Sequence, residues 1–272
     1  MLRFMLDAHP LLAIPPETGF LMQAKYIEGE GDTARDALFD LITGFPPAGP
    51  TWNDFGLTRE ELRFELELAE PFDLASGIRA FYRLYAARQN KPRYGDKTPF
   101  YCEHIDSIRQ LLPEARFVHI IRDGRDSALS LRPLWFSPGK DITTLANQWR
   151  RLVEKARADG REDYLEIRYE RLLTETEAVL REVCTFIDLP FDPVMLRYYE
   201  HASERLKQHR TMHNPAGEVL VTHEQRVKQD KLLMEPPQQE RIARWKEEMT
   251  SAEQAEFRAA AGDLLKELGY EL

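Results

Sequence analysis

The part of the sequence that most constrains the fold is an alternation of strand and helix patterns between Lys91 and Leu189. Two runs rich in β-branched and aromatic residues, RFVHII and DYLEIRY, are each followed by a helical pattern. Strands that are joined through crossover helices pair in parallel. The sequence therefore predicts an α/β fold, a parallel sheet flanked by helices, and a helix that starts with a capping box at Thr174 and Glu177 and runs to about Asp188.

Helical patterns extend on both sides of this region. Residues 24–90 are charged and helical, interrupted by the turn-forming run GFPPAGPTWNDFG, which predicts a helical insert or lid. A last helix is expected from Ser251, with Gln254 in the position of a capping box, to Gly269. No repeat or low-complexity linker separates these parts, so we expect a single domain over residues 1–272.

Composition narrows the classes of function. The chain has 37 basic and 46 acidic residues, a net charge of -9, and a nucleic-acid partner is not expected because backbone binding needs a basic face. Cys102 and Cys184 are far apart and in no ligand spacing, which indicates reduced thiols in a cytoplasmic protein. No apolar run reaches the ~18 residues that a membrane span needs. We therefore expect no membrane association. No H-E-x-x-H motif or metal-spaced cluster of cysteines and histidines is present, so no metal is expected either.

The segment FVHIIRDGRDSALSL, residues 117–131, is the first candidate site. An apolar strand ends at Arg122, Gly124 permits a turn, and a helix containing Ser130 follows. In open α/β sheets, ligands bind beyond the carboxyl ends of strands, where a helix N-terminus and a forked arginine favour an anion such as phosphate. The alternative is that Arg122, Asp123, Arg125 and Asp126 pair among themselves on a solvated turn.

Two further segments contain candidate polar residues. In YGDKTPFY, Thr98 and Pro99 predict a helix start, and Lys97 would then need a bound anion to offset the positive end of the helix dipole, unless it simply pairs with Asp96 at the surface. In PPETGF, Glu17 is either an acid in the first turn of a helix or a general base.

Other features favour structural roles. His119 lies within an apolar strand and is expected to be a satisfied core residue, and Tyr169, at the end of a strand, is expected to be half-buried. GEGDTA matches a dinucleotide-binding pattern in letters, but no apolar strand precedes it and its acids would repel a pyrophosphate. No Walker-type lysine loop is present in the sequence.

Taken together, these blocks resemble the sulfotransferases that use 3′-phosphoadenosine 5′-phosphosulfate (PAPS), in particular the bacterial and tyrosylprotein branch. The resemblance covers nearly the whole chain: LDAHP with PPET, GDKTPF, RDGRDSALS, IRYERLL with FIDLPF, and RWKEEM with LLKELGY. It implies a sheet related to the nucleotide kinases. It also implies transfer of a sulfuryl group from PAPS to a hydroxyl or amine, with adenosine 3′,5′-bisphosphate (PAP) as the product.

The resemblance also implies roles for individual residues. Arg122 and Ser130 would bind the 3′-phosphate of the cofactor, while Tyr169 and Arg244 would contact the nucleotide elsewhere. Glu17 falls on the position of the catalytic base, and Lys97 on that of the lysine that stabilises charge at the sulfuryl group. Such a reaction needs a carboxylate to take the acceptor proton and cations where negative charge builds, but no metal.

One departure from the family concerns the beginning of the sequence. Leu2, Met5 and Leu6 have helical spacing without a preceding cap residue. In the family, a strand and a loop like G-x-P-R-S-G-T-T, which holds the 5′-phosphosulfate, precede LDAHP. The resemblance therefore implies that the first strand and this loop are truncated here, and the simplest hypothesis is an upstream start codon.

Two alternatives follow from that departure. The chain could be a catalytically inactive PAP-binding or interaction protein, or a P-loop-type small-molecule kinase on the same kind of sheet. The acceptor, a small molecule or a peptide, is not specified by the sequence. Aromatic residues of the lid favour either an apolar acceptor pocket or plain core packing; they are Trp52, Phe55, Phe72, Phe81, Tyr82 and Tyr85.

Overall fold

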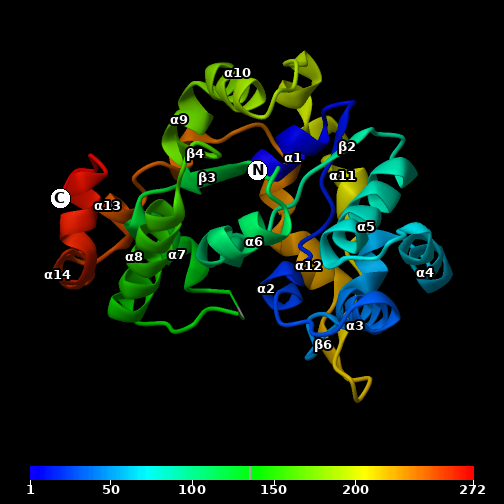
Figure 1. Ribbon diagram of the computed structural model, residues 1–272. Coiled ribbons are helices and arrows are strands. Elements are labelled where there is room, and N and C mark those ends of the chain that lie inside the picture. The colour runs from blue at the N-terminus through cyan, green and yellow to red at the C-terminus, as the bar shows by residue number, and fades with distance from the viewer. Residues whose placement is uncertain (135) are drawn as a thin grey trace. The chain divides into compact units, whose positions relative to one another are not determined.

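The computed structural model describes residues 1–134 and 136–272, and the chain divides into two compact units. Unit 1 comprises residues 1–115 and 191–236, and unit 2 comprises residues 116–190 and 237–272. Figure 1 labels most of the α-helices and several of the strands of both units. The expectation of a single domain with a helical lid stays a prediction.

Unit 2 is built on two parallel strands. β3 (Phe117–Ile121) pairs with β4 (Tyr164–Arg168), with Phe117 opposite Tyr164. Between them the chain forms α7 (Gly124–Leu131) and α8 (Ile142–Asp159). The parallel pair predicted from RFVHII and DYLEIRY is therefore confirmed. The remaining elements of unit 2 are α9 (Tyr169–Thr174), α10 (Thr176–Phe186), the 3-10 helix η5 (Gln239–Arg241), α13 (Trp245–Glu248) and α14 (Ser251–Glu267).

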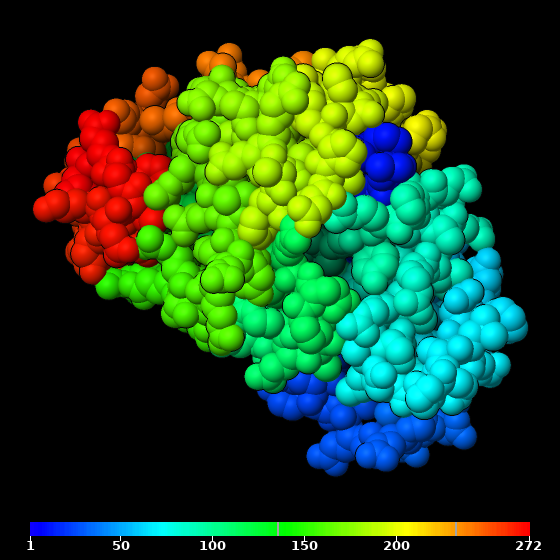
Figure 2. Space-filling view, turned by 45° about the horizontal axis from the view of Figure 1, so that its top comes forward, coloured from blue at the N-terminus to red at the C-terminus, as the bar shows by residue number. Residues whose placement is uncertain are grey.

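The apolar core of unit 2 lies where β3, α7, α8 and α14 meet. Ile121, Trp149 and Phe257 are buried in it, and the rings of Trp149 and Phe257 lie 5.8 Å apart. In Figure 2 the red C-terminal segment packs against the green segment that contains α8. Gly124 has no positive φ; a Cβ there would lie 2.5 Å from both aromatic rings. The glycine is needed for this close approach and not, as the sequence predicts, for the turn.

Helix boundaries in unit 2 differ in detail from those predicted. The region after β4 forms two helices, and the hydroxyl of Thr174 donates to the carbonyl of Glu170 instead of capping a helix. Glu177 pairs with Arg181. The capping box predicted there is therefore wrong, because a turn of helix precedes Thr174.

The last helix is capped one residue earlier than predicted. Thr250 accepts the backbone N–H of Glu253, and both halves of a capping box are present between these two residues. The helical region ends before Gly269, which has a φ of 76° as a glycine after a helix often does.

Unit 1 is mainly helical. It contains α1 (Leu2–Asp7), α2 (Leu21–Ala24), α3 (Gly31–Gly44), α4 (Arg59–Leu68), α5 (Leu74–Arg88), α6 (Ile105–Leu111), α11 (Tyr199–Leu206), α12 (His223–Gln229), and the 3-10 helices η1 (Trp52–Phe55), η2 (Pro99–Glu103), η3 (Pro193–Arg197) and η4 (Lys231–Met234). Two short strands, β1 (Leu12–Ala13) and β2 (Arg93–Tyr94), pair in parallel, and β5 (Met212–His213) pairs antiparallel with β6 (Val219–Val221).

The predicted helix at the start of the sequence is present as α1. Met5 and Leu6 are buried, and no side chain caps its first turn. The helical character predicted for residues 24–90 is also observed, since α3, α4 and α5 occupy most of this range. No helix in the described part of the chain is both long and apolar enough to cross a membrane.

Five of the six aromatic residues of the predicted lid are core residues. Trp52, Phe55, Phe81, Tyr82 and Tyr85 are all buried, and Phe72 is half-buried. The rings of Phe55 and Phe81 lie 5.2 Å apart, edge to face, which is a favourable packing geometry. Plain core packing therefore accounts for these five side chains.

Candidate functional site

The turn between β3 and α7 is held by a buried ion pair. Asp123 is the N-cap of α7, where its carboxylate accepts the backbone N–H of Arg125 and also pairs with the guanidinium of Arg125 at 2.8 Å. The carboxylate of Glu170 accepts the backbone N–H of Asp123. Asp123 and Arg125 do pair with each other, as the alternative interpretation of this segment proposes. Both are buried, however, so the turn is not a solvated one.

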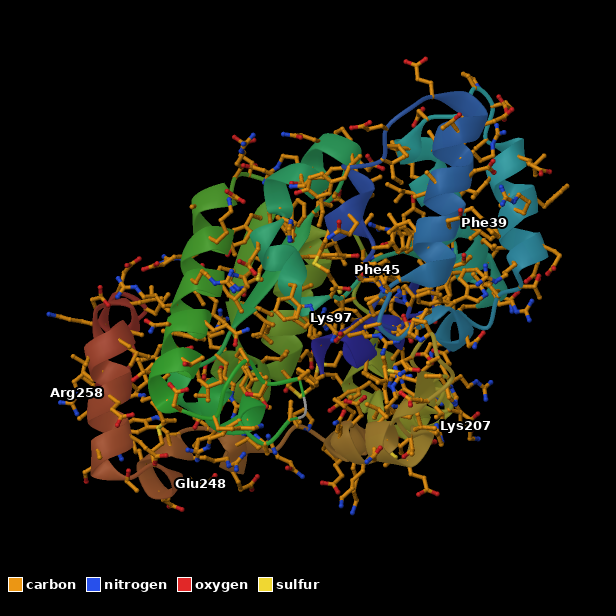
Figure 3. The ribbon with its side chains drawn as sticks, turned by 90° about the horizontal axis from the view of Figure 1, so that it is seen from below. Phe39, Phe45, Lys97, Lys207, Glu248 and Arg258 are labelled. Atoms are coloured by element: carbon orange, nitrogen blue, oxygen red, sulfur yellow. The ribbon has the colours of Figure 1, made fainter. Side chains whose placement is uncertain are left out.

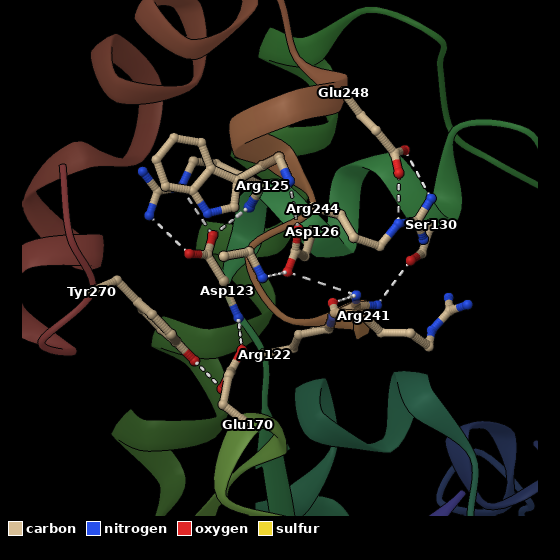
Figure 4. Close-up of polar contacts among 12 residues, drawn as sticks. Arg122, Asp123, Arg125, Asp126, Ser130, Glu170, Arg241, Arg244, Glu248 and Tyr270 are labelled. Atoms are coloured by element: carbon tan, nitrogen blue, oxygen red, sulfur yellow. Dashed lines mark hydrogen bonds and ion pairs between the residues drawn. The ribbon is translucent and has the colours of Figure 1, made fainter. Parts of the chain in front are cut away.

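Arg122 extends from the end of β3 and contacts two other candidate residues, Ser130 and Tyr169, and one backbone carbonyl (Figure 4). Its Nη1 donates to the hydroxyl of Ser130 at 2.8 Å, and its Nη2 donates to the carbonyl of Arg241 at 2.8 Å. The ring centre of Tyr169 lies 4.7 Å from the guanidinium carbon. The structure therefore brings Arg122, Ser130 and Tyr169 together at the carboxyl ends of β3 and β4.

The guanidinium of Arg122 keeps unused hydrogen-bonding capacity. Its Nε is buried and has no hydrogen-bond partner in the described part of the chain, and burial lowers the pKa of the group. The nearest carboxylate, Asp126, is 3.7 Å away, which is too long for a good hydrogen bond. A buried N–H without a partner is costly, so this site would gain from a bound acceptor such as a phosphate oxygen.

Asp126 has a different function, which the sequence does not predict. Its two oxygens accept the backbone N–H groups of Ala243 and Trp245, at 2.8 and 2.9 Å. Ala243 has a φ of 60°, a conformation that residues other than glycine rarely adopt. Asp126 thus fixes the backbone of residues 243–245, close in sequence to the Arg241 carbonyl that Arg122 contacts, and burial raises the pKa of the Asp126 carboxyl group.

Residues 241–245 contain two arginines with different surroundings. Arg244, the predicted cofactor ligand, forms two hydrogen bonds of 2.7 Å with the carboxylate of Glu248, one turn further along. Arg241 supplies the carbonyl that Arg122 contacts, and its side chain is half-exposed. Arg241 is not among the residues predicted from the sequence, although the spacing of the two arginines in RIARW is a signal that could have identified it.

The two candidate catalytic residues meet in unit 1. The amine of Lys97, labelled in Figure 3, forms an ion pair with Glu17. Thr98 starts the 3-10 helix η2 with Pro99 in its first turn, but the Thr98 hydroxyl does not cap it. Two sequence-based alternatives are wrong. Lys97 does not pair with Asp96, and Glu17 is not a first-turn acid because α2 has none.

His119 pairs with a tyrosine, as expected for a satisfied histidine in a strand. Its Nδ1 lies 2.5 Å from the hydroxyl of Tyr164 on β4. Burial and the nearby cations Arg157 and Arg168 lower the pKa of His119 to about 4. No cluster of three or more potential metal ligands occurs among the residues that the structure describes.

Comparison with solved structures places this fold in a known class. The sulfotransferase domain of the Synechococcus PCC 7002 olefin synthase superposes with a TM-score of 0.56 and 21% identity, covering 100% of this chain and 90% of that one. The sulfotransferase domain from the curacin biosynthetic pathway gives a TM-score of 0.54 and 17% identity, with 100% and 93% covered. The fold is therefore that of a sulfotransferase domain.

Sequence comparison gives the family. Residues 1–193 match the family described as "Sulfotransferase family", and this chain belongs to it. Protein-tyrosine sulfotransferase A of Caenorhabditis elegans is 24% identical over 214 residues, which cover 73% of this chain and 49% of that protein. A putative protein-tyrosine sulfotransferase of the same organism is 25% identical over 210 residues, covering 73% and 70%. The match thus spans about half the length of the first of these relatives.

Proposed function

We propose that this protein transfers a sulfuryl group from PAPS to a hydroxyl or amine acceptor and releases PAP. The observation that carries the proposal is the buried, incompletely satisfied guanidinium of Arg122 beside Ser130 in a chain of the sulfotransferase family. Family membership favours sulfuryl transfer over the kinase alternative. The proposed partners are PAPS and a small-molecule or peptide acceptor, and the proposed location is cytoplasmic.

Unit 2 would bind the nucleotide. Arg122 and Ser130 would hold the 3′-phosphate, because a forked guanidinium and a hydroxyl donate hydrogen bonds to phosphate oxygens. Tyr169, whose ring already faces Arg122, would contact the nucleotide as well. Arg244 would take part only after its guanidinium leaves Glu248.

Glu17 and Lys97 are the proposed catalytic residues. Glu17 would accept the proton of the acceptor O–H or N–H as the acceptor atom bonds to sulfur. The bond between sulfur and the phosphate oxygen breaks, and both electrons of that bond leave with PAP. Lys97 would stabilise the negative charge that builds on the sulfuryl oxygens and the leaving phosphate. The observed ion pair shows that each of these two groups is within reach of the other.

The nucleotide site is tested by calorimetric titration with PAP at low and at moderate salt. We expect binding that Arg122→Ala reduces by about 100-fold and Ser130→Ala by about 5- to 10-fold, the usual ranges for charge-assisted and neutral hydrogen bonds. Arg150→Ala is the matched control, because Arg150 is a surface arginine of unit 2 paired with Glu154 and Asp263. Equal binding by Arg122→Ala and Arg150→Ala would refute the assignment.

Transfer is tested with radiolabelled PAPS and a panel of acceptors that includes tyrosine peptides, phenols, alcohols and amines. Glu17→Gln should keep the affinity for PAP and lose turnover, whereas the exposed Glu28→Gln should keep both. Binding of PAP by a chain that sulfates no acceptor would instead favour the inactive PAP-binding alternative.

A further inference from the structure

Two short segments of unit 1, PPETGF and GDKTPF, contact each other through matched side chains. At the surface, Glu17 forms an ion pair with Lys97. Thr18 follows Glu17 in the first segment, and Asp96 precedes Lys97 in the second. The hydroxyl of Thr18 donates to Oδ2 of Asp96 at 2.5 Å. Each catalytic candidate is therefore the direct chain neighbour of a residue in this second contact.

The two contacts differ in burial. The side chains of Glu17 and Lys97 are 53% and 45% exposed, whereas Thr18 is 2% exposed. An exposed ion pair holds two long side chains only weakly, since water and salt screen it. The Thr18–Asp96 hydrogen bond is part-buried and goes to a carboxylate, so it is stronger and fixes geometry better. The inner contact between Thr18 and Asp96 is therefore better suited than the ion pair to set the relative placement of Glu17 and Lys97.

Asp96 is itself firmly held. Its Oδ2 also accepts the hydroxyl of Tyr82 at 2.5 Å, and its Oδ1 accepts the hydroxyl of Thr98 at 3.1 Å. Burial raises the pKa of Asp96, while the hydrogen bonds from Thr18, Tyr82 and Thr98 act in the opposite direction. The ring of Tyr82 stacks on that of Tyr94 and is part of the aromatic core.

Further contacts tie the hydroxyl of Thr18 to the same cluster. It lies 2.7 Å from the hydroxyl of Tyr101, and the backbone N–H of Gly19 donates to the hydroxyl of Thr98 at 3.3 Å. The cluster of Thr18, Tyr82, Asp96, Thr98 and Tyr101 therefore joins the two segments to the core of unit 1.

We propose that Asp96 is a positioning residue that, through Thr18, holds Glu17 and Lys97 facing each other. This inference rests on the proposed roles of the two catalytic candidates. It adds that Asp96 and Thr18 set the distance between the proposed proton acceptor, Glu17, and the proposed stabilising cation, Lys97.

The test is competitive acylation of the full chain with trace acetic anhydride, followed by mass spectrometry. Pairing with Glu17 shields the amine of Lys97, so we expect Asp96→Asn and Thr18→Val each to raise its acylation rate by about two- to fivefold, the range of a lost exposed ion pair. The exposed Lys266 is the internal reference. Thr18→Ser retains the hydroxyl and should keep the wild-type rate.

Two comparisons separate positioning from general loosening of unit 1. Glu17→Gln alone should give the same increase at Lys97, and adding Asp96→Asn to it should give no further increase. The side chain of Lys91 is 13% exposed and its amine contacts the carbonyls of Asp7 and Leu12, so its acylation should not change. The proposal would be overturned by an unchanged acylation rate at Lys97 in Asp96→Asn and Thr18→Val, or by additive effects of Glu17→Gln and Asp96→Asn. An equal rise in the acylation rate at Lys91 would overturn it as well.

These readouts need no turnover, so they can be distinguished from a failure of the proposed function. If the wild-type chain transfers no sulfuryl group to any acceptor, the proposed function fails while the acylation pattern still decides the role of Asp96. If transfer is observed, Asp96→Asn and Thr18→Val should lower kcat by about 10- to 100-fold with unchanged affinity for PAP, because small errors in the placement of catalytic groups are costly.

Discussion

The carboxylate of Glu248 accepts two hydrogen bonds of 2.7 Å from the guanidinium of Arg244, which lies one helical turn earlier in the chain. Arg244 directly precedes Trp245, whose backbone N–H donates to Asp126. The pair gives Arg244 an internal anionic partner, with which the proposed cofactor would have to compete. Any contribution of Arg244 to cofactor binding must therefore first overcome its attraction to Glu248.

Removal of that competing charge should strengthen binding of PAP. We expect Glu248→Gln to lower the Kd for PAP by about two- to fivefold, the range of a lost exposed ion pair, because Arg244 then has no carboxylate to leave. Glu247→Gln is the control, because it removes the same charge from the neighbouring, exposed position. Titration calorimetry measures both. Equal changes in the two variants would mean that only overall charge matters.

Replacement of Gly124 should destabilise the protein through steric overlap. An alanine Cβ would lie 2.5 Å from ring atoms of Phe257 and Trp149, neither of which can move without displacing the core. We expect Gly124→Ala to lower the free energy of unfolding by roughly 1–3 kcal/mol in urea titrations. Gly44→Ala should change it by less than about 1 kcal/mol, because nothing lies within 4 Å of a Cβ there. A similar cost at both glycines would contradict this explanation.

The buried ion pair between Asp54 and Arg226 should matter more than a surface pair. Asp54 is 2% exposed and accepts hydrogen bonds of 3.0 and 2.6 Å from the Arg226 guanidinium. Burial disfavours its charge, but hydrogen bonds from His209 and Arg226 lower the pKa of Asp54 below its ordinary value.

Truncation of Asp54 leaves a buried cation without its partner. Asp54→Ala should therefore cost roughly 3–5 kcal/mol in urea unfolding, whereas Asp36→Ala, which breaks the exposed pair with Arg63, should cost about 1 kcal/mol or less. A small effect of Asp54→Ala would show that water reaches Arg226 readily.

His119 should make the stability of the protein depend on pH below neutrality. Burial, followed by the charges of Arg157 and Arg168, lowers its pKa from 6.5 to about 4 in the folded state. Between these values the unfolded state binds a proton that the folded state does not. Stability is therefore complete above about pH 6.5 and falls as the pH drops towards 4, by roughly 2–3 kcal/mol.

The measurement is urea unfolding at pH 7.5, 5.5 and 4.5. His119→Gln should lose less stability on acidification than the wild type, and His201→Gln, at an exposed histidine, should behave like the wild type. Parallel pH profiles for all three proteins would rule out His119 as the cause.

The sequence predicted those features that depend on neighbouring residues. β3 and β4 follow from their β-branched composition, and their parallel pairing follows from the helices between them. The burial of Met5 in α1 follows from helical spacing. The closeness of Arg122 to Ser130 follows from a strand that leads directly into a helix, since the two residues are only eight positions apart in the sequence.

Tertiary structure decided the partners of side chains that are distant in sequence. Glu17 and Lys97 are 80 positions apart, and the contact between Thr18 and Asp96 joins the same two segments; no local pattern encodes either pairing. In the same way, the packing of Gly124 against Phe257 exists only because α14 returns to α7. Local periodicity sets which residues face a core, but the choice of partner depends on which elements pack together, and that is a property of the whole chain.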